Sequence, residues 1–451
     1  MANSKAKKFQ TIMLVVFGGI FVFAILVFSQ IIPIGRSNQT TEIAGRVTIW
    51  GSLPQSYLQS MIDTLEDEND TLSITYEEKN EATFDRELIE ALAVGQGPDL
   101  FILPHDKILQ YQDKVAPIPY DRYPRQVFQS RYVDMADLLL SDQGVLGLPF
   151  ILDPLVMYYN KNLLASKFIV EPPEYWDEFF SFSEQVTEAA SVSVDLSAVA
   201  LGSFDNINHA KDLLSAMFMQ TRNPITQFRR NRYLGTLPND FSTVRDFSAQ
   251  TLDFYTSFTD PTKTHYSWNT GMASSRDAFL AEDLALYFGY ATEARTFLRT
   301  NPNINVGVAV LPQMRDMPKV TYATMQSFAL NRASRNPMVA FQVMQSMTDE
   351  RLGLGLSLGL QVPPVFTNRL SIRPTDEVHI KAFYDSAIIA NAWLDPDAAE
   401  TEAGFRRMVR DVNAGLLPPE SAIVRLNQVI NDGFEQLAGG FQLGNESVFD
   451  E

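Results

Sequence analysis

Strand-like and helix-like segments alternate along residues 47–103, and this order constrains the fold more than any other feature of the chain. Short β-branched or apolar runs predict strands, and apolar residues at helical spacing predict helices between them. The expected strands are 47–50, 74–76 and 100–103, and the expected helices are 54–69 and 84–93. A β-α-β-α-β order with short connections requires a parallel sheet covered by helices, so we expect an α/β fold.

Polar side chains follow the carboxyl ends of these strands, where open parallel sheets bind their ligands. Trp50 ends the first strand, Asn80 follows the second, and His105-Asp106-Lys107 follow the third. We therefore expect Trp50, Asn80, Asp106 and Lys107 to contact a ligand. Two alternatives stay open at this point: His105 could have a structural role, and Asp106 could cap the next helix.

The same alternation continues through the rest of the chain. Strands are expected at 155–159, 284–288 and 305–311, and helices at 176–186, 337–350 and 398–436, with 205–300 mostly helical. No internal repeat is present in the sequence. The α/β pattern therefore extends over the whole body of the chain.

The N-terminal region carries an apolar segment, Ile12 to Ile32, in which only Ser29 and Gln30 are polar. At 1.5 Å per residue it would span about 31 Å, which matches the ~30 Å hydrocarbon core of a bilayer. We predict a cytoplasmic tail at 1–11, a transmembrane anchor at 12–34 and a polar tether at 35–46.

The lysines of the first eleven residues orient this segment. Lys5, Lys7 and Lys8 precede it, which predicts a cytoplasmic N-terminus and an extracytoplasmic body. A cleaved signal peptide is the alternative, but its apolar core would be unusually long. In both cases the bulk of the chain leaves the cytoplasm, and the anchored form is a single-pass membrane protein.

Several classes of function are disfavoured by composition and by missing motifs. The chain has no cysteine, four scattered histidines and a net charge of −18. Such acidity repels phosphate backbones, so no nucleic-acid partner is expected. We find no P-loop, G-x-S-x-G or H-E-x-x-H motif, and we expect no metal, no cofactor and no enzymatic activity.

Carboxylates and aromatic residues at predicted strand ends favour a sugar as the ligand. Asp99, Asp106 and Asp153 fall at such ends, and a carboxylate pair of a glycoside hydrolase remains an alternative. Aromatic rings stack on the C–H faces of sugars, while carboxylates and amides bind their hydroxyl groups. The aromatic candidates adjoin loops or strand ends, and for each of them packing in the core is the alternative: Trp50, Trp268, Tyr290 and Trp393.

A series of motifs in the same order resembles the extracellular solute-binding proteins of ABC importers, in the class that includes maltose-binding protein. The resembling stretches cover roughly residues 47–440 and read VTIW, ALAVGQGPDLFIL, GVLGLPFILDPLVMYYNKNLL, PPEYWDEF, LALYFGYATEA with NVGVAVLP, and ALNRASRNPMVAFQVMQSMTDE. The resemblance implies a two-lobe periplasmic-binding-protein type II fold that traps its ligand between the lobes by hinge closure. It implies lobe one at 47–151 plus 321–365 and lobe two at 152–320 plus 366–451.

The resemblance also assigns ligand contacts. Asp106 and Lys107 match an Asp-Arg pair that binds sugar hydroxyls in this class, with lysine replacing the planar arginine fork. Asp153 matches a sugar-binding glutamate and Trp393 a stacking aromatic residue, while Tyr290 stands near the position of an expected tryptophan.

The resulting expectation is a monomeric, membrane-tethered protein that captures a sugar or oligosaccharide for an ABC permease. The expected ligand contacts are Trp50, Asn80, Asp106, Lys107, Asp153, Tyr290 and Trp393. A glycan hydrolase and a surface scaffold without ligand are the alternatives. The sequence does not specify which sugar is bound.

Overall fold

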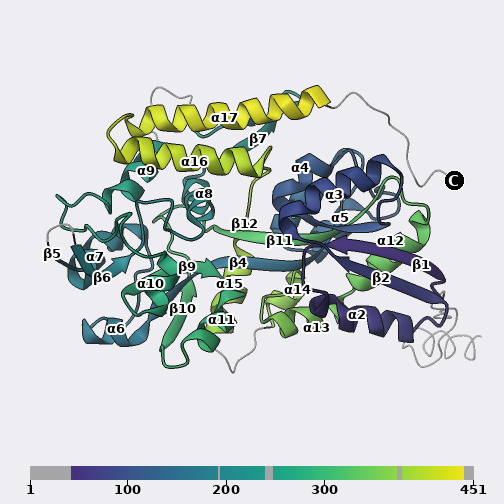
Figure 1. Cartoon of the computed structure of the whole chain (residues 1–451), viewed down its shortest axis with the longest axis horizontal. Helices are drawn as coiled ribbons and strands as arrows, with labels where there is room; N and C mark the ends of the chain where they lie inside the picture. The colour runs from purple at the N-terminus through teal and green to yellow at the C-terminus, as the bar shows by residue number, and fades with distance from the viewer. Residues whose placement is uncertain (1–41, 191–192, 239–246, 373–377, 441–451) are drawn as a thin grey trace, which may run out of the picture. The chain divides into compact units, whose positions relative to one another are not determined.

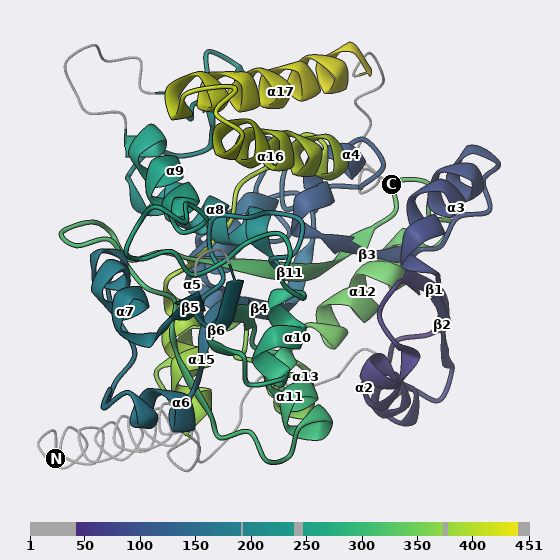
Figure 2. The ribbon, with the colours of Figure 1, turned by 60° about the vertical axis from the view of Figure 1, so that its left-hand side comes forward.

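A computed structural model of the chain describes residues 42–190, 193–238, 247–372 and 378–440. The chain divides into two units, Met1–Ala44 and Gly45–Glu451. The second unit contains all the helices and strands described below (Figures 1 and 2).

One mixed sheet organises the second unit. Its strand order is β2-β1-β3-β11-β4-β9-β6-β5, with β10 paired to β4 and β12 paired to β11. The strands are β1 (Gly45–Gly51), β2 (Leu72–Glu78), β3 (Leu100–Pro104), β4 (Leu148–Asn160), β5 (Glu188–Ala190), β6 (Ser193–Val199), β9 (Leu284–Tyr290), β10 (Val306–Val310), β11 (Thr321–Leu330) and β12 (Ala390–Asn391). A separate hairpin pairs β7 (Thr226–Arg229) with β8 (Arg232–Gly235).

Helices connect these strands and pack against them. They are α2 (Gln55–Asp67), α3 (Glu81–Ala93), α4 (Ile108–Tyr111), α5 (Arg125–Arg131), α6 (Lys161–Ser166), α7 (Phe179–Val186), α8 (Ala210–Gln220), α9 (Phe247–Ser257), α10 (Ser275–Leu280), α11 (Glu293–Thr300), α12 (Pro337–Met347), α13 (Glu350–Leu360), α14 (Thr367–Leu370), α15 (Val378–Ile388), α16 (Ala398–Asn413) and α17 (Pro419–Gly440). Short 3₁₀ turns add η1 (His105–Lys107), η2 (Asp134–Leu139) and η3 (Trp176–Glu178). The last two long helices, α16 and α17, pack side by side (Figures 1 and 2).

The long strand β4 connects the two halves of the sheet. Up to Pro154 it pairs antiparallel with β11, and from Leu155 onward it pairs antiparallel with β9 and β10. All of its residues except Tyr159 are buried, as expected for a strand covered on both faces. The change of partner at Pro154 and Leu155 therefore lies inside the core, next to the carboxylate of Asp153.

The predicted α/β pattern is confirmed where hydrophobic periodicity was clear. The strands β1, β2 and β3 are parallel and alternate with α2 and α3, as the sequence predicts. The prediction of a mostly helical 205–300 missed the hairpin β7–β8, whose strands are short and carry few buried residues. The sheet as a whole is mixed, because β11 runs antiparallel to both β3 and β4.

The predicted tail, transmembrane anchor and most of the tether, residues 1–41, lie outside the described residues. None of the helices over the described residues is long and apolar enough to cross a bilayer.

Gly144 is a position where the fold requires glycine. Its φ is +148°, and a Cβ built there would lie 2.2 Å from the backbone oxygen of Ile118. Ile118 and Val145 form an isolated β-bridge beside it, so the two segments cannot separate without breaking hydrogen bonds.

We expect Gly144→Ala to lower the free energy of unfolding by about 2–3 kcal/mol, because it adds backbone strain and a clash with main chain. The control is Gly355→Ala, an exposed position in α13 where an added Cβ meets nothing within 4 Å. That substitution should raise stability by about 0.5–1 kcal/mol through helix propensity. Urea unfolding of both variants measures the difference, and equal effects would contradict the assignment.

Candidate functional site

His105 and Tyr322 form a buried pair between the end of β3 and the start of β11. Nδ1 of His105 accepts a hydrogen bond from the backbone N–H of Met325 at 3.3 Å, and Nε2 lies 3.0 Å from the Tyr322 hydroxyl. A backbone N–H can only donate, so the neutral ring carries its proton on Nε2 and donates it to Tyr322. Burial lowers the pKa of His105, which keeps the ring neutral at physiological pH.

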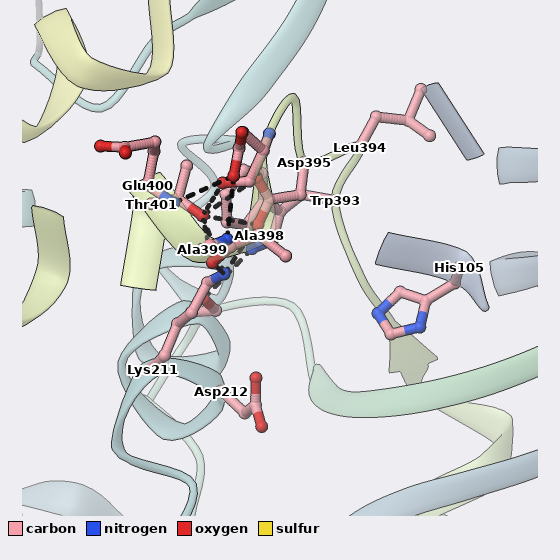
Figure 3. Close-up of polar contacts among 12 residues, drawn as sticks. His105, Lys211, Asp212, Trp393, Leu394, Asp395, Ala398, Ala399, Glu400 and Thr401 are labelled. Atoms are coloured by element: carbon pink, nitrogen blue, oxygen red, sulfur yellow. Dashed lines mark hydrogen bonds and ion pairs between the residues drawn. The ribbon is translucent and has the colours of Figure 1, made fainter. Parts of the chain in front are cut away.

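Acidic side chains from three distant segments surround this pair. Burial raises the pKa of Tyr322 well above its usual value, and the charges of Asp212, Asp106 and Asp395 raise it further. These carboxylates belong to the start of α8, to η1 and to the loop after β12. Figure 3 shows the ring of His105 and the carboxylate of Asp212 pointing toward the same region from opposite sides. The fold thus brings the end of β3 close to the start of α8.

Asp212 is oriented by Tyr290, the last residue of β9. The Tyr290 hydroxyl donates to Oδ2 of Asp212 at 2.7 Å. Burial raises the pKa of Asp212, while this hydrogen bond and the charges of His209 and Lys211 oppose the shift. No other side-chain partner of Asp212 occurs within the described ranges, so its second oxygen is free to accept a hydrogen bond.

Glu293 fixes the backbone beside Tyr290. It accepts hydrogen bonds from the Tyr290 backbone N–H at 2.9 Å and from His209 Nε2 at 2.8 Å, and Arg276 lies 2.7 Å away. Burial alone would lower the pKa of His209, but the hydrogen bond and charge of Glu293 raise it. The His209 ring also packs edge-on against Tyr290, with centroids 4.7 Å apart. This network holds Tyr290 and His209 in place.

Lys211 is fully engaged within its own half of the protein. Its ammonium donates to Asp395 at 2.7 Å, to Thr401 at 2.8 Å and to the Ala398 carbonyl at 3.2 Å (Figure 3). Three acceptors satisfy the three protons of the ammonium group. Lys211 therefore fixes the loop before α16 and has no proton left for Asp212 or a ligand.

Trp393 lies in that same loop and is 4 % exposed. Its Nε1 donates to Ser215 Oγ at 3.1 Å, and the Lys211 ammonium is 5.5 Å from its ring. The structure thus places Trp393 against α8 with its N–H satisfied. Stacking of Trp393 on a ligand stays a prediction.

Asp106 and Lys107 have different surroundings. Lys107 forms an ion pair with Asp85, which also accepts a hydrogen bond from the Tyr111 hydroxyl at 2.6 Å. Within the described residues, Asp106 has no hydrogen-bond or ion-pair partner, and neither η1 nor α4 has a side-chain cap. A capping role for Asp106 is therefore not found, and its carboxylate is half-buried next to His105.

Trp50 and Asn80 lie at the predicted strand ends, but both side chains have local partners. The Lys79 ammonium is 3.7 Å from the centroid of the Trp50 ring, and Asn80 is exposed and caps α3 through the Ala82 N–H. The buried Nε1 of Trp50 has no hydrogen-bond partner within the part of the chain that the structure describes. A ligand contact from either residue stays a prediction.

Asp153 is buried in β4 near the point where this strand changes partner. Its carboxylate accepts hydrogen bonds from the backbone N–H of Thr292 at 3.1 Å and from the Thr292 hydroxyl at 2.5 Å. Burial raises the pKa of Asp153 to about 6, against the effect of these hydrogen bonds. In this structure Asp153 anchors the start of α11.

The arrangement can bind a ligand that carries hydroxyl groups. Asp106 and the second oxygen of Asp212 can accept hydrogen bonds, and the Tyr322 hydroxyl, which accepts one from His105 Nε2–H, can donate its own proton to a ligand. Sequence reasoning missed His209, Asp212 and Tyr322. The polar residues 208–212, Asn-His-Ala-Lys-Asp, could have marked the start of α8 as a candidate site. Nothing in this stretch, however, indicates that it lies opposite the end of β3.

A family model decides the class of protein. The model described as bacterial extracellular solute-binding protein matches residues 60–381, which is well over half of the chain. The chain belongs to this family. The resemblance inferred from the motif order is confirmed.

Curated relatives match a shorter stretch. The maltotriose-binding protein of Pyrococcus abyssi is 30% identical over 147 residues, or 32% of this chain and 31% of that protein. The galactooligosaccharide-binding protein of Bacillus subtilis is 26% identical over 122 residues, or 27% of this chain and 26% of that protein. The alignments thus span about a third or less of each relative's length.

Solved structures share the fold over most of the chain. A cyclic alpha-maltosyl-1,6-maltose binding protein from Arthrobacter globiformis gives a TM-score of 0.72 at 14% identity, over 87% of this chain and 100% of that one. The sugar-binding protein of Xanthomonas citri gives 0.70 at 17% identity, over 89% and 100%. A cyclo/maltodextrin-binding protein complexed with maltotetraose gives 0.69 at 15% identity, over 86% and 96%. The fold is the two-lobe α/β fold of these proteins.

The raised pKa of Asp153 predicts how stability depends on pH. The carboxyl of Asp153 has a pKa of about 6 in the folded state and 3.8 in the unfolded state, so between pH 3.8 and pH 6 the folded state binds more protons. The contribution of Asp153 to the free energy of unfolding therefore falls as pH rises through this range. We expect Asp153→Asn to be more stable than the parent by about 2 kcal/mol at pH 7.5 and equal to it near pH 4.

Guanidinium unfolding at both pH values measures this difference. Asp67→Asn, at the exposed end of α2, is the control and should show no such change with pH. A loss of stability in Asp153→Asn at pH 7.5 would contradict the assignment.

Proposed function

We propose that the chain captures a sugar or oligosaccharide between its two lobes and delivers it to an ABC permease. The observation that carries this proposal is that side chains from the two halves of the sheet lie close together. Asp106, His105 and Tyr322 come from one half. Asp212 and Tyr290 come from the other half. These groups are contributed by segments on both sides of the β4 partner change, so a ligand held by both sets would bridge the halves.

A saccharide fits the free hydrogen-bonding groups. Unpartnered carboxylate oxygens accept hydrogen bonds from sugar hydroxyls, and such charge-assisted bonds are about twice as strong as neutral ones. Tyr290 and His209 add ring surfaces beside them. The maltotriose-, galactooligosaccharide- and maltodextrin-binding relatives support the same class of ligand.

The lobes are proposed at 47–151 plus 321–365 and 152–320 plus 366–451. The partner change of β4 at Pro154 and Leu155 supports a boundary close to 151.

The apolar segment at 12–34 supports a membrane tether, which would raise the receptor's concentration near its permease. The ligand contacts are proposed to include Asp106, Asp212, Tyr290 and Tyr322.

Asp212→Ala tests the site. Loss of a hydrogen bond to a charged group costs about 1.5–3 kcal/mol, so saccharide affinity should fall roughly 10- to 100-fold. Calorimetric titration with maltotriose, mannotriose and a galactooligosaccharide measures this fall. The melting temperature should change little, because loss of the hydrogen bond from the Tyr290 hydroxyl is offset by removal of a carboxylate whose burial raises its pKa.

Asp253→Ala, an exposed carboxylate on α9, is the matched control and should bind like the parent. If none of the saccharides binds the parent protein, the sugar proposal is wrong and a scaffold role is favoured. Release of smaller saccharides during the titration would instead favour the hydrolase alternative.

A further inference from the structure

The hairpin β7–β8 concentrates positive charge on an acidic protein. Arg229, Arg230 and Arg232 are exposed, and among the described residues the side chain of none of the three has an ion-pair or hydrogen-bond partner. The whole chain carries a net charge of −18. Three neighbouring cations repel one another, so their clustering without partners inside the fold points to an anionic group that binds there.

The backbone of the turn supports this interpretation. Arg230 and Asn231 both have positive φ, 51° and 65°, and they connect the paired residues Arg229 and Arg232. Two-residue turns with positive φ at both positions strongly favour asparagine and glycine. An arginine at the first of them is conformationally unfavourable, so its charge at the tip of the hairpin has to be explained by something other than folding.

An apolar groove adjoins these arginines. A cavity of about 600 Å³ is lined by Phe228 and Tyr233 of the hairpin, Phe434 and Leu437 of α17 and Leu109 of α4. We call it the arginine groove, because Arg232 lies at its lining as well. Tyr233 stacks on Phe434 with centroids 5.6 Å apart, and β8 packs against α17. Phe228 is 53% exposed, so the groove presents aromatic surface to solvent.

The chain itself contains a segment with matching chemistry. Residues 441–451, FQLGNESVFDE, follow α17 directly and have no lysine or arginine. They combine three acidic residues with the apolar residues Phe441, Leu443, Val448 and Phe449. Ala438, three positions before this segment, lines the groove. Eleven residues reach at most about 36–40 Å when extended, which is enough to return over the hairpin.

We propose that residues 441–451 dock in the arginine groove, with their apolar side chains against Phe434 and Tyr233 and their carboxylates beside the three arginines. Attachment to α17 gives the segment a high effective concentration, on the order of millimolar for a short tether. Ion pairs between carboxylates and guanidinium groups at the rim of the groove, and burial of aromatic side chains at its floor, both stabilise the docked segment. The arginine groove shares no residue with the ligand contacts proposed above. Its lining comes from both proposed lobes, with Leu109 and Gln112 from lobe one and the hairpin and α17 from lobe two, so the test below is made without added saccharide.

Nitroxide labels on the full chain test the proposal, since the absence of cysteine lets two introduced cysteines be labelled alone. We expect Ser447→Cys and Gln112→Cys, labelled together, to give a short, narrow distance distribution in low salt. Gln112 lies at the groove lining, directly after α4. The distribution should become broad in 1 M NaCl, which screens the ion pairs, and in Arg229→Gln/Arg230→Gln/Arg232→Gln.

A second triple variant controls for lost charge. Arg295→Gln, Arg299→Gln and Arg407→Gln remove three exposed arginines elsewhere, without an ion pair in the described residues, and should leave the distribution narrow. Melting curves of both triple variants confirm folding. A broad distribution in the parent, or a narrow one that survives loss of the hairpin arginines, would overturn the proposal. A different result would assign the arginines to a membrane surface instead. In that case the parent gives a broad distance distribution and binds phosphatidylglycerol vesicles, and the hairpin variant does not bind them.

Discussion

The antiparallel ladder between β4 and β11 is the constraint on which the rest of the structure depends. It joins the parallel set β2-β1-β3 to the set β9-β6-β5 within one sheet. Because β4 is buried along nearly all of its length, the register between the two sets is fixed, so any movement of one set relative to the other has to bend the connecting strands rather than slide them. The ladder positions part of the candidate site directly, since Tyr322 and Met325 lie on β11 and Asp153 lies on β4.

The cationic side chains around the site are already paired with carboxylates of the protein. Lys211, Lys107, His209 and Arg276 are each bound to a carboxylate of the protein. Among the described residues, the groups of the site without a partner are Asp106 and one oxygen of Asp212, and both are hydrogen-bond acceptors. A buried charge without partners is costly, so such groups persist where a polar ligand can satisfy them. The chemistry of the site thus follows from the ion pairs around it.

The sequence predicts the local elements well where apolar periodicity is strong. The strands and helices from Val47 to Leu103 and the polar strand ends at Trp50 and Asp106 are examples. The sequence does not predict that α8 faces the end of β3, because that contact depends on long-range pairing through β4 and β11. For the same reason it names Asp106 but misses Asp212 and Tyr322. The hairpin β7–β8 was missed because its exposed arginines give no hydrophobic alternation.

The central claim is that a saccharide bound by groups from both halves draws the two lobes together. One label in each proposed lobe measures this directly, at Glu90→Cys in α3 and at Glu400→Cys in α16, both exposed in the parent. The account predicts that the distance between the labels shortens when the saccharide that binds in calorimetry is added at saturation, and that it does not shorten in Asp212→Ala at the same concentration. A distance that is unchanged in the parent with saccharide bound would contradict the account.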